Sequence, residues 1–293
     1  MIFLSFCLFV FIIYFLPIWV VSRLALKHGE VFIYAASFAI SLSYFWIYFL
    51  VKNILGFDIY VFIGGLVVLN LMFFLIKTDH QVKSFIISTI KRVLIIMCIL
   101  FPLVFKFGDV FTAWDALSSF NRWAVDIYYS NYKASGTAYP ILISCILALV
   151  YDFQGTNEIW WTAKISLIVF PVFFLLIIIS AYQKYKNPLF FIFPLMIYHY
   201  LTFRAVIGGE ADFPLVVTGC SILFLSYLYN LYKNKSYIVC ALILGGLASL
   251  IKQSGIVFLL FPTLLLVLNI NFNKLSLNTV KKEYRVICSL ILS

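Results

Sequence analysis

The chain has 293 residues, of which 65% are hydrophobic and only 11% are charged, and its mean hydropathy is +1.09. A soluble domain has about 45–50% apolar and about 25% charged residues, so this chain cannot cover its surface with polar groups. The composition excludes an ordinary soluble domain and predicts a protein solvated by lipid. The formal net charge is +10. In a membrane protein such an excess usually belongs to cytoplasmic loops, so we expect membrane lipids and no nucleic acid as partners.

Nine apolar stretches come close to the length of about 20 residues that a transmembrane helix needs. In chain order they are Ile2–Val21, Val31–Val51, Ile59–Ile76, a segment within Phe85–Phe105, Trp160–Tyr182, Pro188–Phe203, Phe213–Tyr229, Tyr237–Ile251 and Gly255–Ile270. The first has no basic n-region and no cleavage site, which favours a retained helix over a signal peptide. In the fourth, we expect Lys91 and Arg92 to extend toward one interface. The sequence thus predicts an all-α, polytopic membrane protein that forms one transmembrane domain over residues 1–293.

The apolar stretch Pro140–Tyr151 is too short to cross, because twelve residues of helix span only about 18 Å of a hydrocarbon core about 30 Å thick. If it does not cross and the N-terminus is outside, 14 Lys and Arg face the cytoplasm and 7 face outward. If it crosses, these numbers become 9 and 12. The positive-inside rule favours the first arrangement. We therefore expect helices within 1–105, an external loop over 106–159 with a juxtamembrane helix opened by Pro140, and further helices within 160–293.

The same topology segregates the acidic residues, because eight of the eleven fall on the external side. The eight are Asp58, Asp109, Asp115, Asp126, Asp152, Glu158, Glu210 and Asp212. Acidic residues contribute little to topology, so their segregation is a separate indication of chemistry on that side.

The six cysteines show neither CxxC nor Cys/His spacing. This pattern favours small buried hydrophobes over a disulfide framework or a metal site. We therefore expect no metal centre built on cysteine.

The longest external segment covers residues 106–158, and long loops that are not disordered are usually functional. Its aromatic residues, among them Trp114, Trp123 and Tyr139, provide apolar surface that can pack against the membrane interface. Asp115 follows the end of a crossing by about ten residues and has apolar neighbours on both sides. An acidic residue at that depth favours a functional role for Asp115. The tryptophans alone are as typical of an interfacial aromatic belt as of a functional site.

Two further segments place charges at the same face. Glu210 and Asp212 follow a flexible Gly-Gly pair at the mouth of a crossing. Asp212 could simply cap the helix there, although capping does not explain the second acid. Lys252 lies in a short outer loop and would alone be an ordinary snorkelling lysine. Together with Arg122, these residues offer carboxylates that can accept a proton and cations that can neutralise a phosphate.

Five short motifs occur in the order seen in multi-spanning bacterial glycosyltransferases of the GT-C superfamily, which the chain resembles over about Phe105–Phe261. They are Trp114-Asp115-Ala116, Trp123-Ala124, Tyr139-Pro140, Ala211-Asp212-Phe213-Pro214-Leu215 and Lys252-Gln253-Ser254-Gly255. The resemblance implies a polyprenyl-phosphate sugar as donor, Asp115 as the catalytic acid position and Asp212 as the second. The C-terminal helices of many members are missing here, since the chain ends in the short apolar run Val286–Ser293. We expect either a variant architecture or a chain cut within its next helix.

We therefore expect a mannosyltransferase-like membrane enzyme that transfers a sugar from a polyprenyl-phosphate carrier to a glycan, lipid or protein acceptor outside the cytoplasm, in the bacterial inner membrane. We expect Asp115 to be the general base and Asp212 to orient the acceptor. The cations expected to bind the donor phosphate are Arg122 and Lys252. The substrate-binding candidates are Arg122, Trp114, Trp123, Tyr139, Glu210 and Lys252. The sequence indicates no specific cofactor, and Asp212 could hold a divalent metal ion if the reaction uses one. A transporter or flippase for a lipid-linked glycan is the main alternative, and a non-catalytic membrane subunit is the other.

Overall fold

The computed structural model describes residues 2–74, 80–105, 116–132, 140–158, 160–195 and 211–269. Within these ranges the chain forms helices and turns and no strand, which confirms the predicted all-α class. The helices are α1 (Ile2–Val10), α2 (Leu16–Ala25), α3 (Glu30–Phe49), α4 (Ile59–Phe74), α5 (His80–Phe105), α6 (Arg122–Tyr128), α7 (Leu142–Gln154), α8 (Trp160–Ser166), α9 (Val169–Tyr185), α12 (Asp212–Tyr232), α13 (Lys235–Ile251) and α14 (Ile256–Asn269). Short π-helical segments join α1 to α2 (Phe11–Phe15), extend α3 (Leu50–Ile54) and precede α6 (Ala116–Asn121).

Four helical stretches of the described chain are long and apolar enough to cross a membrane. They are Leu4–His28, Glu30–Ile54, Trp160–Tyr185 and Asp212–Tyr232. Three shorter apolar helices accompany them, at Leu142–Gln154, Lys235–Ile251 and Gln253–Leu268. Together these helices indicate an integral membrane protein. The predicted number of nine crossings is not confirmed, because most of the remaining stretches are shorter helices or lie partly outside the described residues. The exception is α5, which has 26 residues but includes the cations Lys83, Lys91 and Arg92.

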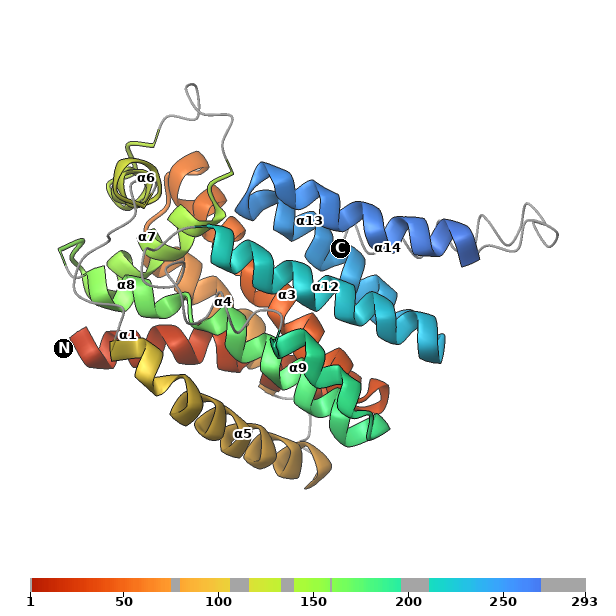
Figure 1. Ribbon diagram of the computed structural model, residues 1–293. Helices are drawn as coiled ribbons and strands as arrows, with labels where there is room; N and C mark the ends of the chain where they lie inside the picture. The colour runs from red at the N-terminus through yellow and green to blue at the C-terminus, as the bar shows by residue number, and fades with distance from the viewer. Residues whose placement is uncertain are drawn as a thin grey trace.

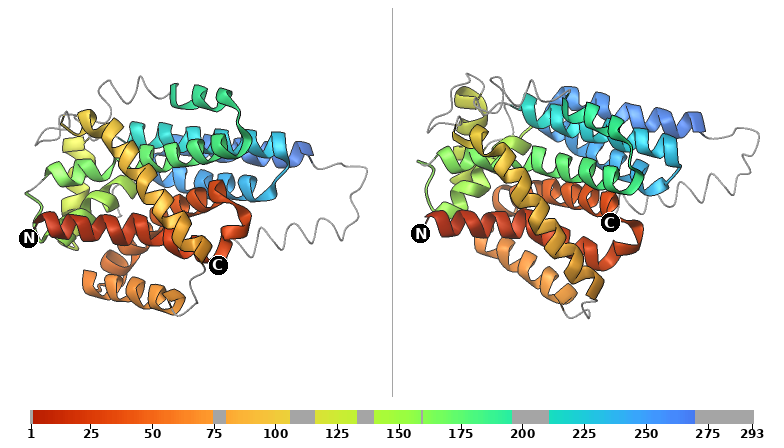
Figure 2. Two further views of the ribbon diagram at one scale, coloured as in Figure 1. Left: turned by 90° about the horizontal axis from the view of Figure 1, so that it is seen from below. Right: turned by 60° about the horizontal axis from the view of Figure 1, so that its bottom comes forward.

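Helix α3 lies at the centre of the bundle, where it packs against α2, α7, α9 and α13. Its side chains Tyr34, Phe38, Phe45 and Tyr48 are fully buried, and the ring of Phe38 stacks on Phe173 of α9 with 5.2 Å between centroids. Helices α12, α13 and α14 pack together beside it (Figure 1). Helix α5 runs obliquely across the outside of the bundle, in contact with α2 and α9 (Figure 2). The core is therefore apolar and aromatic around α3.

The short helix α7 is enclosed by protein on all faces. Every residue of Leu142–Tyr151 is buried, and the helix packs against α1, α3, α6 and α8. The sequence predicts a helix here, but at the membrane interface and opened by Pro140. In the structure Ile141 is the N-cap and Pro140 precedes the helix, which Gly155 ends in a left-handed conformation with φ of 70°. The relation of α7 to the membrane surface stays a prediction.

The described cysteines are free thiols in different surroundings. Cys145 and Cys240 are buried, whereas Cys7 and Cys98 are exposed. The prediction of buried cysteines is therefore wrong for Cys7 and Cys98. Both belong to apolar helices, α1 and α5, and lipid can replace protein as the apolar surroundings of their outer faces.

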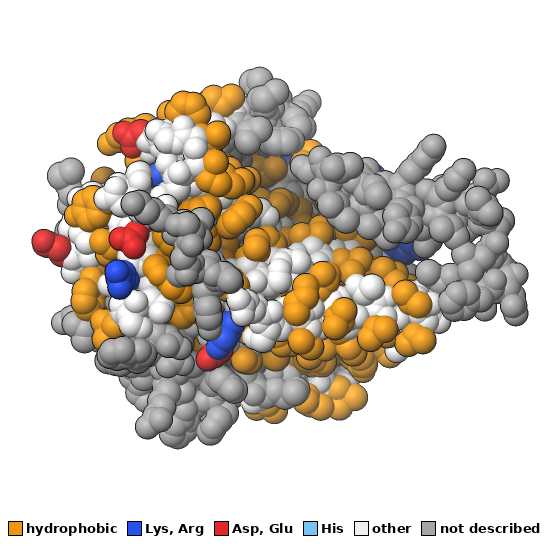
Figure 3. All heavy atoms as spheres, turned by 90° about the horizontal axis from the view of Figure 1, so that it is seen from above, with side chains coloured by type: hydrophobic (Ala, Val, Ile, Leu, Met, Phe, Trp, Pro, Cys, Tyr) orange, Lys and Arg blue, Asp and Glu red, His pale blue; other side chains and the backbone are white. Residues whose placement is uncertain are grey.

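The bundle has two ends of different charge. The first, which we call the α7 end, holds α6, α7, the end of α3 and the start of α12, toward the left of Figure 1. Asp126, Asp152 and Asp212 belong to these elements. All Asp and Glu side chains visible in Figure 3 lie in the left half of the picture, whereas hydrophobic side chains cover most of the described surface in the right half. We call the opposite end, where Glu30 begins α3, the basic end. Its described cations include Arg23, Lys27, Lys184, Lys186, Lys233 and Lys235.

Candidate functional site

Asp212 and Lys252 form an ion pair at the α7 end. Lys252 Nζ donates to Asp212 Oδ1 at 2.6 Å and so joins residues 40 positions apart in the chain. The side chain of Lys252 is 27% exposed and that of Asp212 is 46% exposed. An ion pair so exposed contributes about 0–1 kcal/mol to stability, because water and salt screen the attraction. It can therefore open to a ligand without loss of the fold.

The position of Asp212 excludes the simple capping role. Helix α12 begins at Asp212 itself, and its N-cap is Ala211, which makes no side-chain capping bond. Pro214 lies in the first turn, where a missing N–H leaves no helix hydrogen bond unmade. The Asp212 carboxylate complements the helix dipole but binds Lys252. The interpretation of Asp212 as only a cap is therefore wrong.

A tight turn after α13 directs Lys252 toward Asp212. Lys252 has an extended backbone, with φ −153° and ψ 148°, and its carbonyl accepts a hydrogen bond from the Gly255 N–H at 2.8 Å. A Cβ on Gly255 would lie 2.0 Å from the carbonyl oxygen of Ala248 in α13. Only glycine permits this approach of the turn to the end of α13. The spacing Lys252-Gln253-Ser254-Gly255 therefore has a structural cause.

A second Lys–Asp pair is buried at the same end. Lys52, in the π-helical extension of α3, donates to Asp152 Oδ1 of α7 at 2.6 Å, and the Tyr48 hydroxyl donates to Oδ2. Both side chains of the ion pair are 9% exposed. Lys52 Nζ also lies 5.1 Å from the ring centre of Tyr128 in α6. This cluster, which we call the buried pair, joins α3, α6 and α7.

The buried pair is satisfied within the protein. Burial raises the pKa of the Asp152 carboxyl above its usual value, while hydrogen bonds from Lys52 and Tyr48 act in the opposite direction. Beside it, the Tyr151 hydroxyl donates to Asn121 Oδ1 at 2.5 Å and links α7 to the segment before α6. These contacts anchor α7 beneath α6. The half-exposed ion pair of Asp212 is the better candidate for ligand binding.

Two predicted substrate-binding residues begin α6. Arg122 is exposed at the surface of the α7 end. Trp123 is half-buried, with its ring edge-on to Phe120 at 5.9 Å. Arg122 is therefore open to a ligand, whereas the indole of Trp123 partly serves packing. Four further candidates fall outside the described residues, and their place relative to Asp212 stays a prediction: Asp115, Trp114, Tyr139 and Glu210.

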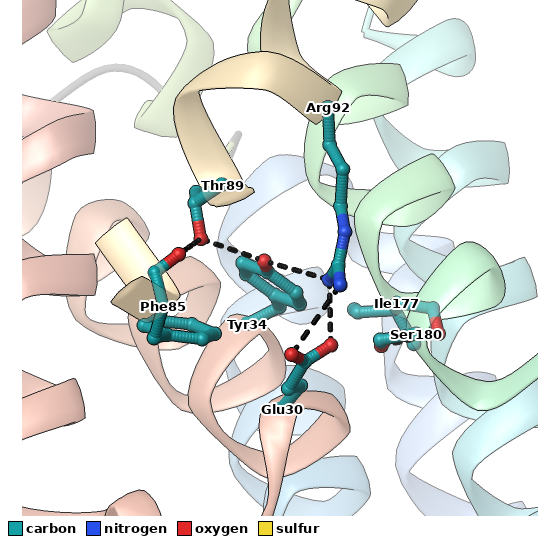
Figure 4. A network of polar contacts seen from close by, with 7 residues as sticks. All are labelled: Glu30, Tyr34, Phe85, Thr89, Arg92, Ile177 and Ser180. Carbon is teal, nitrogen blue, oxygen red and sulfur yellow. Dashed lines mark hydrogen bonds and ion pairs between the residues drawn. The ribbon is translucent and has the colours of Figure 1, made fainter. Parts of the chain in front are cut away.

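A polar network joins α3 to α5 near the basic end (Figure 4). Arg92 donates to Glu30 Oε2 at 2.5 Å and to the Tyr34 hydroxyl at 3.2 Å. The Tyr34 and Thr89 hydroxyls lie 2.8 Å apart. Arg92 thus binds Glu30 and Tyr34, which lie one helical turn apart on α3. Glu30 begins α3, and the extension of Arg92 toward a membrane interface stays a prediction. This network belongs to the opposite end of α3 from the buried pair.

Sequence reasoning missed the role of Lys52, Asp152 and Tyr48. Lys52 and Asp152 each follow an apolar run, and the predicted topology places both charges on the external side without pairing them. Opposite charges beside apolar runs at one face are a signal of pairing, because an isolated charge there is costly. The choice of partner depends on α7 lying beside α3, which the sequence does not reveal.

Within the described ranges, no group of three or more His, Cys, Asp and Glu side chains is placed to hold a metal ion. Comparisons with protein-family models, with characterised proteins and with solved structures give no match. A functional assignment therefore rests on the residues of the chain itself.

Proposed function

We propose that this protein is a membrane glycosyltransferase that transfers a sugar from a polyprenyl-phosphate donor to an acceptor on the extracytoplasmic side. The half-exposed ion pair of Asp212 and Lys252 at one end of an apolar bundle carries the proposal. It offers an anion and a cation that ligands can separate. A lipid-linked donor can approach such a place from the bilayer and a hydroxyl acceptor from water.

In the proposed reaction, the bond between the anomeric carbon and the phosphate oxygen breaks, and the acceptor hydroxyl oxygen forms the new bond. Negative charge gathers on the departing polyprenyl phosphate, and Lys252 stabilises it as it turns from Asp212 to the phosphate. Arg122 adds a bidentate contact. The hydroxyl proton passes to a carboxylate, a role that we assign to Asp115, while Asp212 orients the acceptor.

The rest of the proposed substrate site comes from the external loop and the segment before α12. The isoprenoid tail and the sugar ring are expected to contact the aromatic side chains of Trp114, Trp123 and Tyr139, because aromatic rings favour the membrane interface. Glu210 is a further acceptor contact. If the proposed reaction uses a divalent metal ion, Asp212 is its expected ligand. The proposed location is the bacterial inner membrane, with the N-terminus and the site extracytoplasmic.

Sugar transfer in proteoliposomes with a polyprenyl-phosphate sugar tests the proposal. Asp115→Asn should lower the transfer rate on the order of 10²–10⁴-fold, since it removes the base. Lys252→Ala should raise the donor KM, and Lys252→Arg should retain more activity because the charge remains. Lys91→Ala, at an exposed position of α5 away from the site, is the matched control for loss of a cation. Equal activity of Lys252→Ala and Lys91→Ala would contradict the assignment of Lys252.

A flippase for a lipid-linked glycan is the second candidate. The ion pair of Arg92 and Glu30 places charge between two helices of the bundle, and ionisable groups inside membrane proteins often mark transport pathways. Passage of the intact donor across the proteoliposome membrane, with no cleavage of its sugar–phosphate bond, would favour this candidate.

A further inference from the structure

Three helices of the bundle end with the same pairing of a cation and an aromatic ring. In each, the cation follows the aromatic residue by four positions and lies over its ring. The pairs are Arg23 over Trp19 at 4.0 Å, Lys186 over Tyr182 at 5.8 Å and Lys233 over Tyr229 at 5.8 Å. These pairs lie at the ends of α2, α9 and α12.

The two lysines of this set occupy backbone positions that usually favour glycine. Lys186 has φ of 55° and Lys233 has φ of 53°, the left-handed conformation that ends α9 and α12. The Lys186 N–H donates to the Tyr182 carbonyl at 2.7 Å, and the Lys233 N–H donates to the Tyr229 carbonyl at 2.8 Å. Glycine would make the same backbone bonds without steric cost. The backbone therefore does not explain two lysines at these places, whereas their charged side chains do.

These helix ends lie together. Lys184 Nζ lies 3.8 Å from the position that a Cβ on Gly29 would take, which brings the end of α9 to the turn between α2 and α3. The rings of Tyr185 and Tyr232 stack with 3.6 Å between centroids, which brings together the ends of α9 and α12. The Tyr185 hydroxyl lies 2.7 Å from that of Tyr237 in α13. The cations thus share one surface.

The surface of the basic end is cationic and apolar at once. Lys27, Lys184, Lys186, Lys233 and Lys235 are all exposed. Large apolar side chains are exposed beside them, namely Leu24, Leu189, Ile192 and Leu231. Among the described residues of this end the acid is Glu30, which binds Arg92. Exposed lysines beside aromatic and aliphatic side chains are the composition that suits a membrane interface.

We propose that the basic end is a binding surface for the headgroups of anionic phospholipids. The ammonium groups of Lys186 and Lys233 contact the lipid phosphates, and the exposed side chains of Leu189, Ile192 and Leu231 lie at the boundary with the acyl chains. This inference does not depend on the proposed glycosyltransferase activity, because the surface lies at the opposite end of the bundle from Asp212. It also means that the basic end faces the more anionic leaflet of the membrane.

Native mass spectrometry of the purified full chain, with phosphatidylglycerol or phosphatidylcholine of equal chain length added in neutral detergent, tests the proposal. The wild type should prefer phosphatidylglycerol. Because each lysine near an anionic lipid surface strengthens association about fivefold, K186G/K233G should bind phosphatidylglycerol on the order of 25-fold more weakly. Binding of phosphatidylcholine should not change. The glycines fit the left-handed positions, so this variant should fold, which a melting curve checks.

The charge-conserving variant K186R/K233R is the matched control and should retain the preference for phosphatidylglycerol. Inorganic phosphate, at the ionic strength of a chloride control, should not displace the lipid. Equal binding of the two lipids by the wild type would overturn the proposal. So would unchanged phosphatidylglycerol binding by K186G/K233G, or competition by inorganic phosphate, which would indicate a site for free anions.

Discussion

The buried pair should be the point at which single substitutions unfold the protein most readily. Asp152→Ala removes both oxygens that Lys52 Nζ binds, in a place where the lysine side chain is only 9% exposed. Lys52 then retains ring contacts with Tyr48 and Tyr128, which are worth about 0.5–2 kcal/mol, against a desolvation cost of several kcal/mol. We expect a loss of about 3–5 kcal/mol of stability.

Removal of both charges should cost little. Lys52→Met with Asp152→Leu replaces the pair by apolar side chains of similar volume, an exchange that is often neutral in protein interiors. Denaturation by SDS in mixed micelles measures the free energy of unfolding of each variant. Asp212→Ala, which opens the exposed pair, is the matched control and should cost about 0–1 kcal/mol. A loss below about 1 kcal/mol for Asp152→Ala, or additive losses in the double variant, would refute the reasoning.

The pH dependence of the stability of the Lys52→Met variant tests the burial of Asp152 separately. Burial already raises the pKa of Asp152, and loss of the lysine removes a group that lowers it. The folded protein then binds the carboxyl proton more tightly than the unfolded chain, where the pKa is about 4. The stability of this variant should therefore be highest below about pH 4 and fall as the pH rises through the folded pKa. A stability that increases over that range would contradict the burial of Asp152.

Two further predictions concern the turn at Lys252 and the topology. Gly255→Ala should destabilise the protein by about 1–3 kcal/mol, because the new Cβ would meet the Ala248 carbonyl. Gly246→Ala, in α13 with open space around it, is the control and should leave stability unchanged or increase it. SDS denaturation measures the free energy of unfolding of both variants. Single cysteines at Ser118 and Gly155, with the native cysteines replaced, should both react with an impermeant thiol reagent added outside. Reaction of the second only from the cytoplasmic side would mean that the chain crosses the membrane between them.

The helices could be predicted from the sequence because long apolar runs dominate it. The stretch expected at Phe213–Tyr229 lies within α12, and Tyr237–Ile251 lies within α13. The enclosure of α7 could not be predicted, since a short apolar helix suits a membrane interface and a protein interior equally well. Its surroundings depend on α1, α3, α6 and α8 meeting around it.

The candidate site could be predicted only in part. The sequence nominates Asp212 and Lys252 separately, by the chemistry of their types and their common face. Their contact depends on the packing of α12 beside α13 and on the close approach of Gly255 to Ala248. For Arg92, hydropathy indicates an interfacial charge, while the acceptors that bind it come from α3, more than fifty residues earlier in the chain.

The fate of the donor tests the central proposal most directly. Purified wild-type protein in liposomes receives a polyprenyl-phosphate sugar labelled in the sugar, together with a glycan acceptor, and the labelled products are separated over time. The proposal predicts that label leaves the lipid, appears on the acceptor and is accompanied by polyprenyl phosphate, and that Asp212→Asn slows this transfer. Label that stays on intact donor while the donor changes leaflet would contradict it.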